Sequence, residues 1–263
     1  MLFMFIDCHA HLNNIISSDY TLKRVIDDAV KEGVNFVVGV ISNPKSYSFY
    51  KQQLKFDNII NVLGIYSLQP DDVIDQKLAL LQNTIEMTKP NAIGELFYAK
   101  VNDSARQKRI DELFRKQIQI AHNYNLPIVT CTGYSSSKDF LRLLKEEKAE
   151  ELGGQIHCCR NSLDVVNSLC DLGFYLSYGS PPSTKLINPL DDEMITGLIK
   201  HTPLERFLTE TDSPAGMIGE PPKPRYTPAK IPEIAKNLAS VKEINIEEFA
   251  KIVMNNALKL FDF

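Results

Sequence analysis

The sequence alternates regularly between short β-type runs and longer stretches with a helical pattern. The β-type runs are rich in Val, Ile and Leu, and the stretches between them carry apolar residues at helical spacing. The predicted strands are residues 3–8, 34–40, 59–65, 92–96, 127–132, 154–158, 173–177 and 207–211. The predicted helices are residues 21–32, 44–55, 71–88, 103–124, 137–150, 163–172, 191–200, 228–240 and 246–260. A chain with this alternation is restricted to an α/β architecture.

The number of strand–helix units distinguishes between the two common α/β architectures. Strict alternation predicts a parallel sheet, and apolar runs without polar alternation fit strands that are buried on both faces. Eight units favour closure into a barrel over an open doubly wound sheet. We therefore predict a (β/α)8 TIM barrel with an additional C-terminal helix. The 263 residues suit one such barrel, so we expect a single domain over 1–263.

The composition excludes some classes of function. Apolar residues make up 44% of the chain and the net charge is −4, without a long basic run. Binding of nucleic acid through phosphate neutralisation alone is therefore not expected. The five cysteines form no CxxC motif, and no secretion signal is recognisable before Asp7. We expect free thiols in the cytoplasm, and no segment has the length of a membrane span.

Side chains that bind metals stand at the carboxyl ends of several predicted strands, which is where barrel enzymes carry their active groups. These residues are His9, His11, Glu95, Cys131, His157 and Asp212. Each one alone is more simply explained as a structural side chain. Alternation along an extended strand places His9 and His11 on the same side, so both can face one ion. The joint pattern therefore indicates a site for a divalent metal.

Several motifs resemble those of the TatD-like deoxyribonuclease family, in the family's order and over nearly the whole chain. The residues that resemble the family are 6–12 (IDCHAHL), 92–95 (AIGE), 126–129 (LPIV), 155–158 (QIHC), 172–177 (LGFYLS), 208–214 (LTETDSP), Asn256, Leu260 and Phe261. The resemblance implies a metal-dependent hydrolase that cleaves phosphodiester bonds by a metal-activated water, with DNA or another phosphodiester as its substrate.

The resemblance also implies how one or two divalent ions would be bound. The first ion would be bound by the two histidines of the opening motif, His9 and His11, and by Asp212. Glu95 bridges to a second ion, which is also held by the residues that end the fifth and sixth strands. Asp212 would in addition orient the water or accept its proton. Glu95 and Asp212 are therefore the predicted catalytic residues.

Cys131 stands where the family carries a histidine. A cysteine thiolate binds zinc well but is a poor partner for magnesium. The ions are therefore expected to be zinc, magnesium or manganese, with zinc favoured if Cys131 is a ligand. The alternative is that Cys131 is an inert buried thiol and the second ion is lost.

The predicted substrate-binding residues also depart from the family. Tyr66 and Gly133 stand where the family has a histidine and an arginine that are expected to hold substrate phosphate. The predicted substrate-binding residues are Tyr66, Arg160 and Arg225. Further cations and aromatic residues expected on loops of the same rim are Lys100, Lys223, Tyr98 and Tyr134. The aromatic residues either stack on a base or cover the barrel as ordinary apolar side chains.

Three hypotheses about function remain open from the sequence. The first is a metal-dependent hydrolase of TatD type that acts on nucleic acid. The second keeps the metal-dependent hydrolase but gives it a non-nucleic-acid ester or amide, because the phosphate-holding pair is missing. The third is a catalytically impaired relative with a binding role. The fold alone does not decide among them, because one barrel hosts many reactions.

Overall fold

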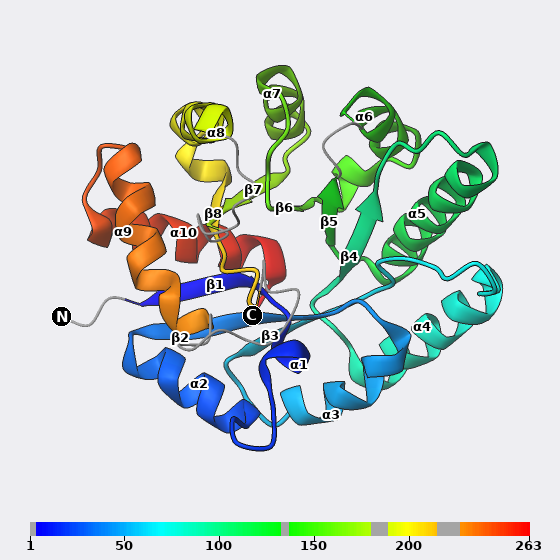
Figure 1. Ribbon diagram of the computed structural model, residues 1–263, viewed down its shortest axis with the longest axis horizontal. Coiled ribbons are helices and arrows are strands. Elements are labelled where there is room, and N and C mark those ends of the chain that lie inside the picture. Colours follow the sequence, from blue (N-terminus) through cyan, green and yellow to red (C-terminus); the bar gives the residue numbers. More distant parts are fainter. Residues whose placement is uncertain (1–3, 133–136, 180–188, 215–226) are drawn as a thin grey trace.

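The structure is a computed structural model that describes residues 4–132, 137–179, 189–214 and 227–263. Within them lie eight strands that form one sheet in the order of the chain (Figure 1). The strands are β1 (Phe5–Ala10), β2 (Val34–Ile41), β3 (Ile59–Leu63), β4 (Ala92–Tyr98), β5 (Ile128–Thr132), β6 (Gly154–His157), β7 (Tyr175–Tyr178) and β8 (Phe207–Thr209). Every neighbouring pair from β1 to β8 is parallel.

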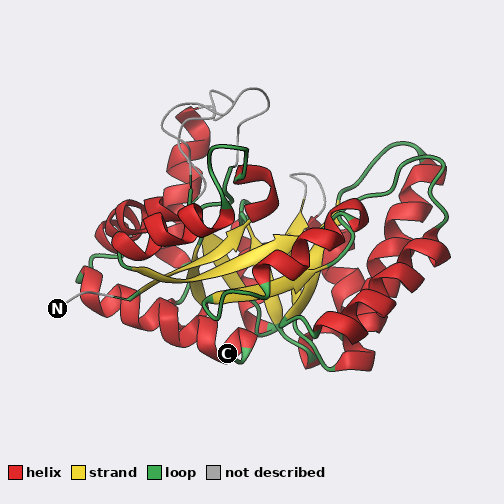
Figure 2. Cartoon of the chain, turned by 90° about the horizontal axis from the view of Figure 1, so that it is seen from below, coloured by secondary structure: helices red, strands yellow, loops and turns green. Residues whose placement is uncertain are grey.

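Helices follow the strands and surround them (Figure 2). The helices are α1 (Leu12–Ile15), α2 (Leu22–Lys31), α3 (Tyr50–Gln53), α4 (Ile74–Thr88), α5 (Ser104–Tyr124), α6 (Ser137–Glu146), α7 (Leu163–Asp171), α8 (Pro189–His201), α9 (Ile231–Val241) and α10 (Ile246–Phe261). Short 3-10 helices are η1 (Pro44–Phe49), η2 (Ala149–Glu151), η3 (Leu204–Arg206) and η4 (Pro228–Lys230). None of the helices in the described residues is both long and apolar enough to span a membrane.

The two outer strands of the sheet meet and bring the barrel close to closure. A parallel bridge joins Ala10 to Ser213, and the Thr209 hydroxyl donates to the carbonyl of Ile6 at 3.0 Å. The predicted (β/α)8 barrel is confirmed. All residues of β1 and β3 are buried, as expected for strands with apolar neighbours on both faces.

Local signals in the sequence explain where the helices begin. The side chain of Thr21 accepts from the backbone NH of Arg24 at the start of α2. Asp103 caps α5, and Asn245 caps α10 by accepting from the backbone NH of Glu247. Such caps satisfy NH groups that have no partner within the helix.

Some predicted boundaries were wrong for identifiable reasons. The helix predicted over 44–55 is a 3-10 turn, η1, followed by the short α3. The predicted first strand ends at residue 8, but β1 continues to Ala10 and so includes His9. β4 likewise extends to Tyr98, because Phe97 and Tyr98 pair with the end of β5. The short α1 was not predicted.

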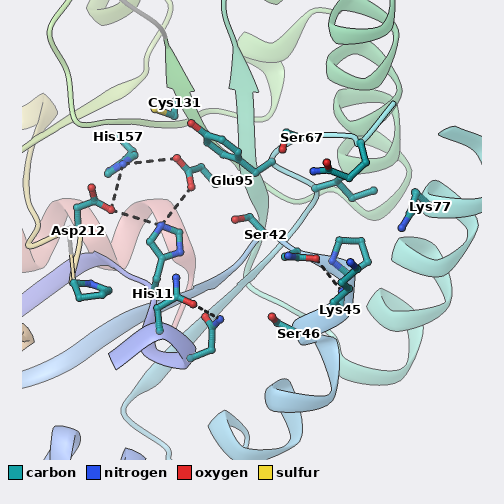
Figure 3. A pocket seen from close by; sticks show the side chains of 18 of the residues that line it. His11, Ser42, Lys45, Ser46, Ser67, Lys77, Glu95, Cys131, His157 and Asp212 are labelled. Atoms are coloured by element: carbon teal, nitrogen blue, oxygen red, sulfur yellow. Dashed lines mark hydrogen bonds and ion pairs between the residues drawn. The ribbon is translucent and has the colours of Figure 1, made fainter. Parts of the chain in front are cut away.

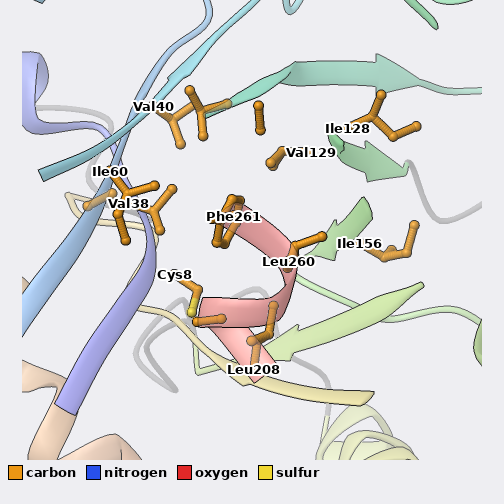
Figure 4. Packing of buried hydrophobic residues seen from close by; sticks show 14 of the residues in the cluster. Cys8, Val38, Val40, Ile60, Ile128, Val129, Ile156, Leu208, Leu260 and Phe261 are labelled. Atoms are coloured by element: carbon orange, nitrogen blue, oxygen red, sulfur yellow. The ribbon is translucent and has the colours of Figure 1, made fainter. Parts of the chain in front are cut away.

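The C-terminal helix α10 closes the barrel at the end where its strands begin. Asn256 donates from Nδ2 to the carbonyls of Leu204 and Phe207, at 2.8 and 2.9 Å. Figure 4 shows Leu260 and Phe261 among apolar side chains from strands on several sides of the barrel. With this end covered by a helix, the opposite end is the one left for a site.

Candidate metal centre and substrate pocket

Five of the six predicted ligands converge at the carboxyl ends of the strands. Figure 3 shows His11, Glu95, His157 and Asp212 among them. The Nε2 atoms of His9 and His11 are 3.4 Å apart. Glu95 Oε2 lies 3.8 Å from His9 Nε2 and 3.5 Å from His11 Nε2. Asp212 Oδ1 lies 3.9 and 3.5 Å from the same two nitrogens. His157 Nε2 completes the cluster, at 3.7 Å from both Glu95 Oε1 and Asp212 Oδ1.

These spacings fit a shared divalent ion. Two ligands that are each about 2.1 Å from one metal lie roughly 3–4 Å apart. The ligand atoms of His9, Glu95 and His157 all lie within 4.8 Å of one another, and so do those of His9, His11 and Asp212. The donors are imidazole nitrogens and carboxylate oxygens, the set used for zinc and related ions.

The protonation state of His9 also fits a metal ligand. Its side chain is fully buried, and its ring stacks on His157 with centroids 3.6 Å apart. Burial, His157 and His11 lower the pKa of His9 well below its usual value, so the ring is neutral and keeps a free lone pair. Its Nδ1 has no hydrogen-bond partner among the described residues. The Nε2 atom is the one that faces His11, Glu95 and Asp212, so it is the atom available to an ion in the cluster.

Glu210 fixes the orientation of His157 and was not predicted as a site residue. Its Oε2 lies 2.8 Å from His157 Nδ1, which turns Nε2 of the ring toward the cluster. Its Oε1 accepts from the backbone NH of Cys158 at 2.7 Å, and the Ser177 hydroxyl donates to Oε2. Histidines that bind metals are commonly oriented by a carboxylate in this way. The only sequence signal was the position of Glu210 beside Asp212.

His157 carries a different charge from His9. Burial disfavours its charged form, but Glu210, Asp212 and Glu95 favour it and raise the pKa of His157 well above its usual value. In the metal-free protein the His157 ring is therefore protonated. A divalent ion at Nε2 would replace that proton.

Asp7 joins the end of β1 to the segment that carries Asp212. Its Oδ1 accepts from the backbone NH groups of Thr211 and His9, at 2.9 and 3.2 Å, and its Oδ2 accepts from the Thr211 hydroxyl. The backbone NH of Asp212 donates to the carbonyl of His9 at 2.9 Å. Asp212 itself has a left-handed backbone, with φ of 52°. These contacts fix the relative positions of His9 and Asp212.

Burial shifts the pKa values of the two predicted catalytic carboxylates toward neutral pH. It raises the pKa of Glu95 to about 7 and that of Asp212 to about 6. Burial also lowers the pKa of His11 to about 4. A carboxylate with a pKa near neutrality exchanges protons efficiently at physiological pH.

Cys131 lies beside the cluster rather than inside it. It stands at the end of β5, where its backbone pairs with that of His157, and its thiol is close enough to Glu95 to lower the pKa of that carboxyl. Burial raises the pKa of the thiol well above its usual value, and nearby acidic groups raise it further. Neither group of ligands centred on His9 includes Cys131. The thiol of Cys158 lies close to His157 and Glu210 and lines the same pocket.

A pocket of about 650 Å³ opens above the cluster and is lined by Tyr66. The ring of Tyr66 lies 4.7 Å from that of Phe97. Burial raises the pKa of the Tyr66 hydroxyl, and the acidic groups of Cys131 and Glu95 add to the shift. The Tyr66 hydroxyl therefore lies near the cluster and remains protonated at neutral pH.

The structure places the other predicted rim residues in different surroundings. Arg160 is half-buried and close enough to Asp212 to lower the pKa of that carboxyl. Tyr98 is not on the rim, because its ring packs in the core against Phe114 and Phe140. Lys100 forms an ion pair with Asp139 at 2.8 Å. Arg225, Lys223 and Tyr134 lie outside the described residues.

A barrel with a histidine and carboxylate cluster at the carboxyl ends of its strands is typical of metal-dependent hydrolases. The model of the family "TatD related DNase" matches residues 6–262, so the chain belongs to that family. The resemblance in the sequence motifs is therefore confirmed, and the chain is a metal-dependent hydrolase of TatD type.

Individual relatives cover almost the whole chain. The uncharacterized metal-dependent hydrolase YabD of Bacillus subtilis is 31% identical over 259 residues, which cover 98% of this chain and 99% of YabD. The human deoxyribonuclease TATDN3 is 29% identical, with 97% of this chain and 94% of TATDN3 covered. The crystal structure of YJJV, a TatD homologue from Escherichia coli, has a TM-score of 0.85 at 20% identity and full coverage of both chains. This last similarity shows that the fold is shared.

Proposed function

We propose that this chain hydrolyses phosphodiester bonds in DNA with one or two bound divalent ions. The observation that carries the proposal is the convergence of three histidines, Glu95 and Asp212 at the floor of an open pocket. The human relative named as a deoxyribonuclease supports DNA as the substrate. We also propose the cytoplasm as the place of action, because Cys8, Cys131, Cys159 and Cys170 form no disulfide.

The proposed ligands divide between two positions. His9, His11 and Asp212 would hold the first ion, and Glu95 would be shared between the two positions. His157 would hold the second ion, with Cys131 as its further ligand. Zinc is the proposed ion if Cys131 takes part, and magnesium or manganese if the ligands are nitrogen and oxygen only. When bound, such ions supply Lewis acidity and neutralise charge on the phosphate.

The residues of the chain then have distinct roles. Asp212 orients the attacking water and accepts its proton. The water oxygen forms a bond to phosphorus as the opposite P–O bond breaks. The leaving oxygen takes up a proton from solvent, and Asp212 releases to solvent the proton that it accepted. The protonated Tyr66 hydroxyl donates to a non-bridging oxygen of the phosphate. Arg160 and Arg225 oppose the negative charge of the substrate.

The test is hydrolysis of fluorescently labelled single-stranded and duplex DNA by metal-reconstituted protein. We expect cleavage that is abolished by a chelator and reduced at least about 100-fold in Asp212→Asn, because removal of a general base costs this much. Asp57→Asn, at an exposed position outside the pocket, is the matched control.

The same experiment distinguishes the other hypotheses. A panel of simple esters and amides is assayed beside the DNA substrates. Turnover of an ester or amide without DNA cleavage would replace the proposed substrate but keep the hydrolase. Metal binding without any turnover would contradict the proposal and favour a binding role.

A further inference from the structure

The pocket has a second end that the proposed reaction does not use. Away from the metal cluster it is lined by polar side chains of two segments, Ser42, Lys45 and Ser46 in the first and Ser67, Gln69, Asp72 and Lys77 in the second. Figure 3 shows Lys45 and Lys77 on the opposite side of the pocket from His157 and Asp212, with Ser42 between the two groups. One continuous cavity therefore joins an acidic end to an end that carries two ammonium groups.

The second end carries an excess of positive charge. Lys77 Nζ pairs with Asp72 Oδ1 at 2.9 Å. Arg109 donates to the backbone carbonyl of Asp72 at 2.7 Å. Among the described residues, no carboxylate lies within ion-pair distance of Lys45, whose side chain is exposed. A hydrogen bond from the Gln69 NH, together with Lys77 and Lys45, lowers the pKa of Asp72. Asp72 is thus one carboxylate facing several cations.

The wall between the two ends is already rigid. The backbone NH of Tyr66 donates to the carbonyl of Ser42 at 2.8 Å. Gln117 brackets Ile65, accepting from its NH at 2.8 Å and donating to its carbonyl at 2.9 Å. The hydroxyl of Tyr47 donates to the carbonyl of Gly64 at 2.9 Å. A ligand at the second end would therefore not have to order this loop, which lowers the cost of binding.

The two ends suit different parts of one substrate. Glu95 and Asp212 repel a phosphate unless a metal is bound between them, whereas Lys45 and Lys77 attract a phosphate directly. The serine hydroxyls nearby are neutral donors for phosphate oxygens. A cavity of about 650 Å³ is in the range of pockets that enclose a ligand of several functional groups.

We propose that Lys45 and Lys77 form a subsite for a second phosphate, so that the protein selects nucleotide chains over simple phosphodiesters. The proposal rests on the proposed function. The scissile phosphate lies at the metal cluster, and a neighbouring phosphate of the same strand lies between the two lysines. A substrate with only one phosphate gains nothing from this subsite.

The test compares two substrates. One is bis(4-nitrophenyl) phosphate, which has a single phosphate, and the other is a labelled single-stranded octanucleotide. For Lys45→Ala combined with Lys77→Ala, we expect KM for the octanucleotide to rise about tenfold or more, since charge-assisted contacts are lost. We expect kcat for the octanucleotide and both constants for the simple ester to stay within about twofold. Lys51→Ala, an exposed lysine of α3 outside the pocket, is the control.

One further variant separates the effect of charge from an effect on folding. Asp72→Asn keeps an oxygen for the Gln69 NH but removes the competing charge, so KM for the octanucleotide is expected to fall. The salt dependence should also change. Losing the neutralisation of this one phosphate lowers the slope of log affinity against log salt by about 0.7 for a single strand. Thermal unfolding and metal content of every variant check that the fold is kept.

Either of two results for the double variant would overturn the subsite. One is an equal loss of activity on both substrates, and the other is no loss on either. If the wild type cleaves neither substrate, the proposed function fails. The subsite is then decided by fluorescence anisotropy of the octanucleotide on metal-loaded protein, where equal affinity of the wild type and the double variant would contradict it.

Discussion

Glu210 lies behind the ring of His157, with its Oε2 2.8 Å from Nδ1, and holds the ring so that Nε2 faces Glu95 and Asp212. The carboxylate is itself held by the backbone NH of Cys158 and by the Ser177 hydroxyl. It therefore cannot turn toward the ion, and its effect passes through the imidazole. Glu210 is a positioning residue for a proposed metal ligand.

Glu210→Gln keeps the shape of this side chain and removes its charge. We expect affinity for the divalent ion to fall about 10- to 100-fold, the usual cost of losing a carboxylate behind a metal-binding histidine. Competition with a chromophoric chelator measures the affinity, and Glu32→Gln at an exposed position is the control. An unchanged affinity would show that His157 does not bind the ion.

Metal binding should release protons in a pH-dependent way. Burial raises the pKa of Glu95 to about 7 and that of Asp212 to about 6, so at pH 6 Glu95 is mostly protonated and Asp212 about half protonated, and by pH 8 most of these protons are lost. A divalent ion binds only the deprotonated forms. Affinity should therefore fall as the pH drops through this window. Calorimetry in buffers of different ionisation enthalpy counts all the protons released, that of His157 included, and a total that is the same at pH 6 and pH 8.5 would contradict the assignment.

Cys131 offers a spectroscopic test of the second metal position. The raised pKa of its thiol means that it keeps its proton at pH 8.5 unless a metal displaces it. If Cys131 is a ligand, cobalt-substituted protein will show a thiolate-to-cobalt charge-transfer band that disappears in Cys131→Ser but not in Cys170→Ser. Cys170 lies in α7 and not in the pocket. No band in the wild type would leave only nitrogen and oxygen ligands.

Phe261 should dominate the stability contributed by α10. Its side chain is 1% exposed and lies among the barrel strands. Truncation to alanine leaves a cavity, so Phe261→Ala should lower the free energy of unfolding by about 3–5 kcal/mol. Urea unfolding measures this, with Leu258→Ala as the control because Leu258 is 39% exposed on the same helix. A loss below about 1 kcal/mol would mean that the end of α10 does not pack as described.

The barrel and the approximate strand positions could be predicted because hydrophobic periodicity is a local signal. The residues that end the strands could be predicted for the same reason, since parallel strands bring their carboxyl ends together. The position of Tyr98 could not be predicted. It depends on the pairing of β4 with β5 continuing through Phe97 and Tyr98, which no local pattern encodes.

The roles of Glu210 and Lys45 also escaped prediction, for a different reason. Glu210 acts on a histidine 53 positions earlier in the chain, and only the neighbouring arrangement of β6, β7 and β8 makes the pair visible. From the sequence alone, a lysine such as Lys45 cannot be distinguished from an ordinary solvated cation. It gains significance only because the pocket brings it to the same cavity as Lys77.

The contacts between β1 and the segment that follows β8 have a consequence for the synthesis of the protein. His9 and His11 leave the ribosome early, but Asp7 and His9 can complete their bonds only when Thr211 and Asp212 have followed some 200 residues later. Until then the emerging chain holds two histidines without the carboxylate that completes their group. A partly translated chain therefore cannot assemble the complete centre. The nascent protein can hydrolyse its substrate only after translation has passed the eighth strand.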